Sequence, residues 1–260
     1  MTLPSSFLNT LVAELDNTQI AGIILGGSYA RGDATLYSDV DIACFVHGEE
    51  NSRPKRFLYR DSLLVSIPTK SIEGVRREMG LPNRAIWTVP GLSGCRILLD
   101  KDGSVAELLR DIEAFRWEPL QEAANEYTSL NMAMSAEQVH KVMSELARGD
   151  GLALAYATSK LFSWLTETIA VQRGVMVQSD RTYYRQVQEA AGAESEWARL
   201  HNVVAGVELG QLVKNPARER AMAVLDLYRE TLALVRSVMR PDHLAVAQQA
   251  SRVADLAPGG

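Results

Sequence analysis

Two segments near the start of the chain predict two strands joined by a sharp turn. Residues 20–25 form an apolar run without a charge, and residues 39–46 begin by alternating acidic with apolar positions. The first pattern is typical of a buried strand and the second of a strand with two different faces. Gly26 and Gly27 directly follow the first run, and glycine accepts backbone conformations that other residues avoid. We therefore expect a tight turn after residue 25.

Further along the first half, the spacing of apolar positions alternates between helical and strand-like. Intervals of three and four residues predict an amphipathic helix over 3–16. Ser71 as an N-cap, with Glu73 in the first turn, predicts a second helix over 71–79. The polar segment 47–56 is expected to be a loop. Short apolar runs predict further strands over 57–69, 85–89 and 95–99.

From Val105 onward apolar residues recur every three or four positions, which predicts a helical second part. Glycines and prolines fall between the periodic segments, where helices end. The boundary is expected near Pro119, so the predicted domains are 1–118, an α/β domain, and 119–260, a helical bundle. The expected helices cover 105–117, 136–147, 152–171, 183–191, 197–212 and 217–239, with one more after Pro241 before the chain frays at 258–260.

Composition and charge exclude several classes of protein. The chain has 260 residues, of which 47% are hydrophobic and 23% charged, which is ordinary for a globular protein. A net charge of −5 argues against a broad nucleic-acid-binding surface. Cys44 and Cys95 lie in apolar runs and predict no disulfide. No apolar run approaches the roughly 18 residues of a membrane span, and no leader is evident, so we expect a cytoplasmic protein.

The turn and the acidic strand together suggest a site for a nucleotide and its metal. Ser28 follows Gly26 and Gly27 at the expected start of a short helix, where a hydroxyl and backbone N–H groups suit phosphate oxygens. Asp39 and Asp41 are two residues apart, so a strand places both carboxylates on one face. Magnesium is usually held by one or two carboxylates together with substrate phosphates. The two features thus complement each other, although each alone is common in turns and on solvated strand edges.

The stretch GGSYARGDATLYSDVDIACF resembles the signature of nucleotidyltransferases of the DNA polymerase β superfamily, in particular the small-molecule, antibiotic-modifying branch. This resemblance implies an α/β (α+β) domain with a small mixed sheet, and a helical bundle covering the cleft. It also implies transfer of a nucleoside monophosphate from an NTP, expected to be ATP, to a small hydroxylated acceptor such as an aminoglycoside- or lincosamide-like antibiotic. Gly26, Gly27 and Ser28 would bind the phosphates, while Asp39 and Asp41 would be catalytic and hold Mg²⁺, two ions being expected. Antibiotic-modifying relatives are sometimes dimers, so a homodimer is a possible assembly.

The chain departs from the family pattern at the third carboxylate. The family usually presents an acid on the strand expected over 57–69, but Ser66 stands at such a position and Asp61 lies at the start of the strand. Asp61 could still reach the site, or the base could come from the helical half. The chain could instead bind nucleotide without transferring it. The glutamates considered in the helical half are Glu122, Glu126, Glu137 and Glu145.

Two further features leave alternatives open. Lys160 lies in an otherwise apolar helical segment and could bind the triphosphate as a point charge, although a lysine extending to solvent explains it as well. Arg53, Lys55, Arg56 and Arg60 form the one obvious basic cluster. That cluster could belong to a nucleotidyltransferase toxin or regulator that modifies tRNA or protein, or could simply be solvated. The acceptor is therefore open at this stage.

Overall fold

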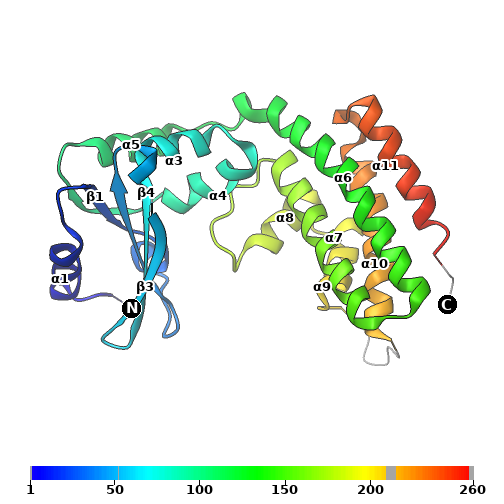
Figure 1. Ribbon diagram of the computed structural model, residues 1–260, viewed down its shortest axis with the longest axis horizontal. Helices are drawn as coiled ribbons and strands as arrows, with labels where there is room; N and C mark the ends of the chain where they lie inside the picture. Colours follow the sequence, from blue (N-terminus) through cyan, green and yellow to red (C-terminus); the bar gives the residue numbers. More distant parts are fainter. Residues whose placement is uncertain (1, 52, 209–214, 258–260) are drawn as a thin grey trace. The chain divides into compact units, whose positions relative to one another are not determined.

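A computed structural model describes residues 2–51, 53–208 and 215–257 of the chain (Figure 1). The chain folds as two compact units, Met1–Arg116 and Trp117–Gly260. The first unit combines a sheet with helices, and the second is helical. The predicted domain limits, 1–118 and 119–260, stay a prediction.

The first unit is built on one mixed five-stranded sheet with the strand order β3-β4-β2-β1-β5. β2 and β4 run parallel, while the β1–β2, β1–β5 and β3–β4 pairs are antiparallel. The sheet confirms the predicted fold class, and β1, β2 and β5 lie within one residue of their predicted positions. The strands are β1 (Ile20–Leu25), β2 (Val40–Val46), β3 (Arg53–Arg60), β4 (Leu63–Ser71) and β5 (Arg96–Asp100).

The helix α1 (Ser5–Leu15) covers one face of this sheet. Its Phe7, Leu8 and Leu11 belong to one core cluster with apolar side chains of β1, β2 and β4, among them Ile23, Val40, Ile42, Val65 and Ile67. Because successive strand residues point to opposite faces, Asp41 and Ser66 lie on the face away from α1. The other helices of the unit are α2 (Gly27–Arg31), α3 (Ile72–Met79), α4 (Pro82–Leu92) and α5 (Ser104–Ala114), and a 3-10 turn covers Glu49–Asn51.

The single strand predicted over 57–69 is wrong, because the chain reverses within it. β3 ends at Arg60 and β4 begins at Leu63, so Asp61 and Ser62 form a two-residue hairpin turn. Both have positive φ, 48° and 64°, which is the conformation of the type I′ turn that connects twisted antiparallel strands. β3 also starts at Arg53, inside the segment that was expected to be a loop.

The strand predicted over 85–89 is also wrong, since these residues belong to α4. Pro82 occupies the first turn of that helix, where its missing N–H costs nothing. Ala85, Ile86 and Val89 are buried, and their spacing of one, three and four positions follows one helix face. By contrast, the predicted helix over 71–79 is confirmed as α3, with the Ser71 side chain accepting a hydrogen bond from the Gly74 N–H.

The second unit confirms the predicted helical region. α6 begins at Gln121, whereas the sequence predicted a helix only from residue 136. Small and polar residues line the buried face of its first half, including Ala124, Thr128 and Ser129, so no clear apolar period marks that half in the sequence. The part of the predicted helix 197–212 that covers 209–212 lies outside the described residues, as does the predicted fraying at 258–260. The helices are α6 (Gln121–Arg148), α7 (Gly151–Gln172), α8 (Tyr183–Ala191), α9 (Glu196–Ala205), α10 (Pro216–Val235) and α11 (Pro241–Ala254), with 3-10 turns at Glu118–Leu120 and Arg236–Val238.

Among the helices of the described ranges, none combines the length and the apolar character that crossing a membrane requires.

Candidate functional site

The turn after β1 is built around the backbone of Asp41. The Gly26 N–H donates to the Asp41 carbonyl oxygen at 2.8 Å, which fixes the end of β1 beside the start of β2. Gly27 has a φ of +61°, and a Cβ added to it would overlap Oδ2 of Asp41. A side chain at position 27 would therefore require both a strained backbone and a displacement of the Asp41 carboxylate.

The short helix α2 continues from this turn, as the sequence predicts. Its first turn contains Ser28, which is half-buried, and the Ser28 carbonyl accepts hydrogen bonds from the Gly32 and Asp33 N–H groups at 2.9 and 3.0 Å. Tyr29 and Ala30 pack against the core cluster under the sheet. Ser28 is thus held one residue away from the glycine that contacts Asp41.

The two predicted carboxylates meet at the start of β2. Asp39 directly precedes the strand and Asp41 is its second residue; both are half-buried. Asp41 is the register partner of Ser66 on β4, and the Ser66 hydroxyl donates to Oδ1 of Asp41 at 2.7 Å. The turn and the acidic pair therefore come together as one site, with Gly26 and Gly27 on the β1 side and Ser66 on the β4 side.

Burial and neighbouring charges set the protonation of Asp41. Desolvation raises the pKa of this carboxyl above its ordinary value, and the negative charge of Asp39 raises it further. The hydrogen bond from Ser66 lowers the pKa, as do the positive charges of Lys55 and Arg31, but burial is the largest effect. A divalent cation at the pair would offset both raising effects, since it supplies opposite charge to two close carboxylates.

Ser66 stands where the family pattern leads one to expect a third acid. Its side chain is fully buried and acts as a donor to Asp41, so it orients that carboxylate and does not replace it. Asp61 is an exposed residue of the β3–β4 turn. The four glutamates Glu122, Glu126, Glu137 and Glu145 all lie on α6 in the second unit. Over the described ranges, no group of three or more His, Cys, Asp or Glu side chains could hold a metal ion.

Sequence reasoning missed Cys95 as a neighbour of the site. A Cβ on Gly26 would lie 3.2 Å from the Cys95 sulfur, and burial together with the charge of Asp41 raises the pKa of this thiol to about 11. Cys95 is therefore a neutral thiol that packs against the turn. No local signal identifies it, because the β1–β5 pairing that brings residue 95 to residue 26 is visible only in the sheet.

The basic cluster is split between the two faces of β3. Arg53 donates to the Gln19 side chain at 2.8 Å and Arg60 to the Glu14 carboxylate at 2.5 and 2.7 Å. Lys55 instead lies over the Phe57 ring, with its Nζ 5.1 Å from the ring centroid. Two of the four cations thus serve structural contacts, while Lys55 belongs to the side of the sheet that carries Asp41.

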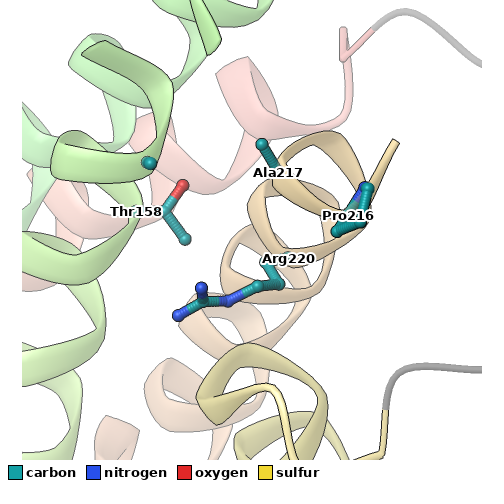
Figure 2. Close-up of a pocket in the computed structure, with 5 residues that line it drawn as sticks. Thr158, Pro216, Ala217 and Arg220 are labelled. Carbon is teal, nitrogen blue, oxygen red and sulfur yellow. The ribbon is translucent and has the colours of Figure 1, made fainter. Parts of the chain in front are cut away.

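The second unit holds the remaining predicted residue, Lys160, whose side chain is exposed on α7. Its role as a nucleotide contact stays a prediction. A cavity of about 150 Å³ in this unit is lined by Ala155, Thr158, Pro216, Ala217 and Arg220. Figure 2 shows Thr158 on one helix across from Ala217 and Arg220 on another. None of the predicted site residues lines this cavity.

Comparison with known proteins gives a family match within the first unit. Residues 8–78 match the family model described as a nucleotidyltransferase domain. This range includes the glycine turn, both aspartates and Ser66, so the match covers the site itself. Such a domain implies an NTP as substrate and transfer of a nucleotidyl group as the general activity. No curated protein matches the chain.

Among solved structures, the chain is similar to a nucleotidyltransferase-like protein from Exiguobacterium sibiricum 255-15. The two share 14% sequence identity with a TM-score of 0.51, over 88% of this chain and 76% of the other. At this level of identity the likeness concerns the fold. The fold is therefore a mixed five-stranded α+β domain, within which residues 8–78 match the nucleotidyltransferase model, followed by a helical region.

Proposed function

We propose that this protein transfers a nucleoside monophosphate from an NTP, expected to be ATP, to a hydroxyl group of a small-molecule acceptor, with release of pyrophosphate. The proposal rests chiefly on the observation that the glycine turn and Asp41 are held against each other. Gly26 binds the Asp41 backbone, and Gly27 leaves room for the Asp41 side chain. A turn suited to phosphate and a carboxylate suited to metal are thereby held together.

The donor set suits magnesium. Asp39 and Asp41 offer hard carboxylate oxygens, and one Asp41 oxygen is already oriented by the Ser66 hydroxyl. One or two carboxylates with substrate phosphates are the usual magnesium ligands, and we expect two ions with the NTP. Bound there, the metal would supply charge stabilisation at the oxygens of the transferred phosphate. Without a third acid, the metal would rely more on water and phosphate ligands.

The residues of the chain would then have distinct tasks in the reaction. Gly26, Gly27 and Ser28 would bind the β- and γ-phosphates, with Lys160 as a further proposed phosphate contact. The acceptor oxygen forms a bond to the α-phosphorus while the bond from that phosphorus to the bridging oxygen breaks, and pyrophosphate leaves. The hydroxyl proton passes to a general base, for which Asp61 and the α6 glutamates stay the candidates.

A small acceptor is preferred to tRNA or protein because two of the four cations of the predicted basic cluster are used for structural contacts. Arg53 and Arg60 bind Gln19 and Glu14, and a polynucleotide would need a continuous row of available cations. An antibiotic of the aminoglycoside or lincosamide type rests on the resemblance alone, and the positive charge of Lys55, considered below, argues against a polycationic aminoglycoside. A homodimer is proposed on the same resemblance and would be detected by light scattering of the purified chain.

The reaction is tested with ATP labelled either at the α- or at the γ-phosphorus, incubated with magnesium and a panel of hydroxylated acceptors. Nucleotidyl transfer predicts that only the α-label moves to an acceptor and that pyrophosphate appears in equal amount. Asp39→Asn and Asp41→Asn should each abolish transfer, while loss of transfer in Asp61→Asn would identify that residue as the base and retained transfer would exclude it. Transfer of the γ-label, or unchanged transfer in both site variants, would reject the proposal.

A further inference from the structure

The exposed face of the edge strand β3 carries two large aromatic side chains beside the candidate site. Phe57 is 60% exposed and Tyr59 is 76% exposed. Phe57 is the register partner of Ser66, which in turn is the partner of Asp41. Register partners point to the same face of a sheet, and so do residues two apart along a strand. Phe57, Tyr59 and Asp41 therefore share one face.

The opposite face of β3 is occupied by structural contacts, so the aromatic face is distinct. Leu58 packs against the core cluster, and Arg60 binds Glu14 of α1. β3 lies at the edge of the sheet, where it can be followed in Figure 1. Exposed aromatic residues on an edge strand favour aggregation unless they bind something. Two exposed rings beside a carboxylate site provide a surface on which a ligand can stack.

Charge on this face comes from Lys55. Its Nζ lies 5.1 Å from the centroid of the Phe57 ring, and its positive charge acts on Asp41 from the same side as the ring. Arg31 also acts on Asp41, but it forms an ion pair with Asp33 at 3.4 Å. Lys55 covers one face of the Phe57 ring, so a ligand would stack on the other face and the cation would lie across the ring from it.

If the proposed function holds, the strand order indicates which of the two substrates, the NTP or the acceptor, would lie over this face of β3. Gly26, Gly27 and Ser28 follow β1 on one side of β2, while β4 and β3 lie on the other side. In an in-line displacement the attacking hydroxyl approaches from the side opposite the leaving group. With pyrophosphate at the glycine turn, the side of β2 away from the leaving group is the one that holds β4 and β3, and we place the acceptor there.

We propose that Phe57, Tyr59 and Lys55, the β3 platform, bind the acceptor, and that the acceptor is a small hydroxylated molecule with a flat ring and a neutral or negative charge. This inference rests on the proposed function for the direction of attack. The two rings supply stacking surface for the flat part of the molecule. Lys55 disfavours a polycationic aminosugar, because a second positive charge would be brought close to its Nζ across the Phe57 ring.

The test uses three probes that share a nitrophenyl ring and differ in the charge of the sugar: 4-nitrophenyl glucoside, its glucuronide and its glucosaminide. Binding to the full chain is measured by ligand-observed NMR with magnesium present and without any NTP. We expect the neutral and anionic probes to bind more tightly than the cationic one. Phe57→Ala/Tyr59→Ala should weaken binding by about tenfold. Tyr156→Ala, which removes a 69% exposed ring from α7, should leave it unchanged.

A charge reversal gives a second, independent readout. Lys55→Glu should invert the order of the probes, so that the cationic glucosaminide binds best. An unchanged order in Lys55→Glu, or equal probe binding in the wild type and in Phe57→Ala/Tyr59→Ala, would overturn the proposal. Because the assay needs no turnover, its outcome is separate from that of the labelled-ATP experiment, which tests the transfer itself.

Discussion

Gly27 is the residue at which the geometry of the site is most restrictive. Its φ of +61° falls in the left-handed region, and the space that a side chain would fill is taken by Oδ2 of Asp41. Gly32 also has a positive φ, +84°, but a Cβ there would meet nothing within 4 Å. Substitutions at the two glycines therefore distinguish the cost of backbone strain, which applies to both, from the cost of displacing the Asp41 carboxylate, which applies only at Gly27.

We expect Gly27→Ala to abolish magnesium-dependent nucleotide binding, because Asp41 must move. The free energy of unfolding should fall by about 2 to 3 kcal/mol from strain and overpacking. Gly32→Ala, the matched control, should lower it by about 1 kcal/mol and retain binding. Urea unfolding and calorimetric titration measure the two effects. Equal behaviour of the two variants would show that the contact with Asp41 is unimportant.

Ser66 provides a second prediction for a single residue. Ser66→Ala leaves an Asp41 oxygen without its hydroxyl donor, which should lower the free energy of unfolding by about 1.5 to 3 kcal/mol. Ser135 is also fully buried, but its hydroxyl donates to the neutral Asn131 carbonyl at 2.8 Å. Ser135→Ala should therefore cost only about 1 kcal/mol. Urea unfolding without metal compares them, and a larger cost for Ser135→Ala would contradict the role given to Ser66.

The main residues of the candidate site could be predicted from the sequence, but the contacts that hold them could not. Gly26, Gly27, Asp39 and Asp41 lie within one short stretch, so local spacing was sufficient to group them. Ser66 reaches Asp41 only through the parallel register of β2 and β4. The family resemblance leads one to expect an acid on that strand, where the sequence has Ser66, and the structure shows that its hydroxyl orients an existing acid.

Among the elements, the β3–β4 hairpin explains the largest error. Its turn, Asp61–Ser62, contains neither glycine nor proline, which are the usual signals of a two-residue turn. A continuous strand was therefore the natural prediction for 57–69. In α4 a short apolar run among prolines and glycines suggested a loop with a short strand, while tertiary packing favoured a helix. The helix α7 was predicted closely because its apolar period extends over several turns, whereas the first half of α6 was missed.

The same turn yields a stability prediction. Ser62 has a φ of 64°, which costs a non-glycine residue free energy that glycine does not lose. We expect Ser62→Gly to raise the free energy of unfolding by about 0.5 to 1 kcal/mol. Ser62→Ala keeps a Cβ at that position and should give no gain. Chemical denaturation measures both, and a loss of stability in Ser62→Gly would show that the turn is not strained.

His201 connects three helices of the second unit as a neutral side chain. Its ring stacks on Trp197 with centroids 4.8 Å apart and contacts the rings of Phe162 and Tyr184. Gln188 donates to Nδ1 at 3.0 Å, so Nε2 carries the proton and faces the Thr166 hydroxyl at 3.2 Å. Burial lowers the pKa of His201 to about 4.

This lowered pKa predicts a pH dependence of stability. Between pH 6.5 and about 4 the unfolded chain binds a proton at His201 that the folded chain does not. The stability is therefore fully present above pH 6.5 and is lost as pH falls, by about 3 kcal/mol from this group. His201→Gln should flatten this part of the curve, while His140→Gln, at an exposed position on α6, should not. Identical slopes in wild type and His201→Gln would contradict the prediction.

For the whole molecule, the predicted domain limits stay a prediction, but the predicted succession of a mixed region and a helical region is confirmed. The change of apolar period from two to about four made this possible. The acceptor could not be predicted from the sequence. The family match ends at residue 78, and the stretch that resembles the family contains the residues expected to bind the phosphates of the donor NTP. The β3 platform became visible only when register placed Phe57 beside Ser66.

The central claim is that Asp39 and Asp41 form a magnesium-dependent nucleotide site. Calorimetric titration of the purified chain with ATP and GTP, with and without magnesium, tests it most directly. We predict nucleotide binding that requires magnesium, is lost in Asp39→Asn/Asp41→Asn and persists in Asp61→Asn. Absence of binding by the folded wild type, or equal binding by the double variant, would contradict the claim.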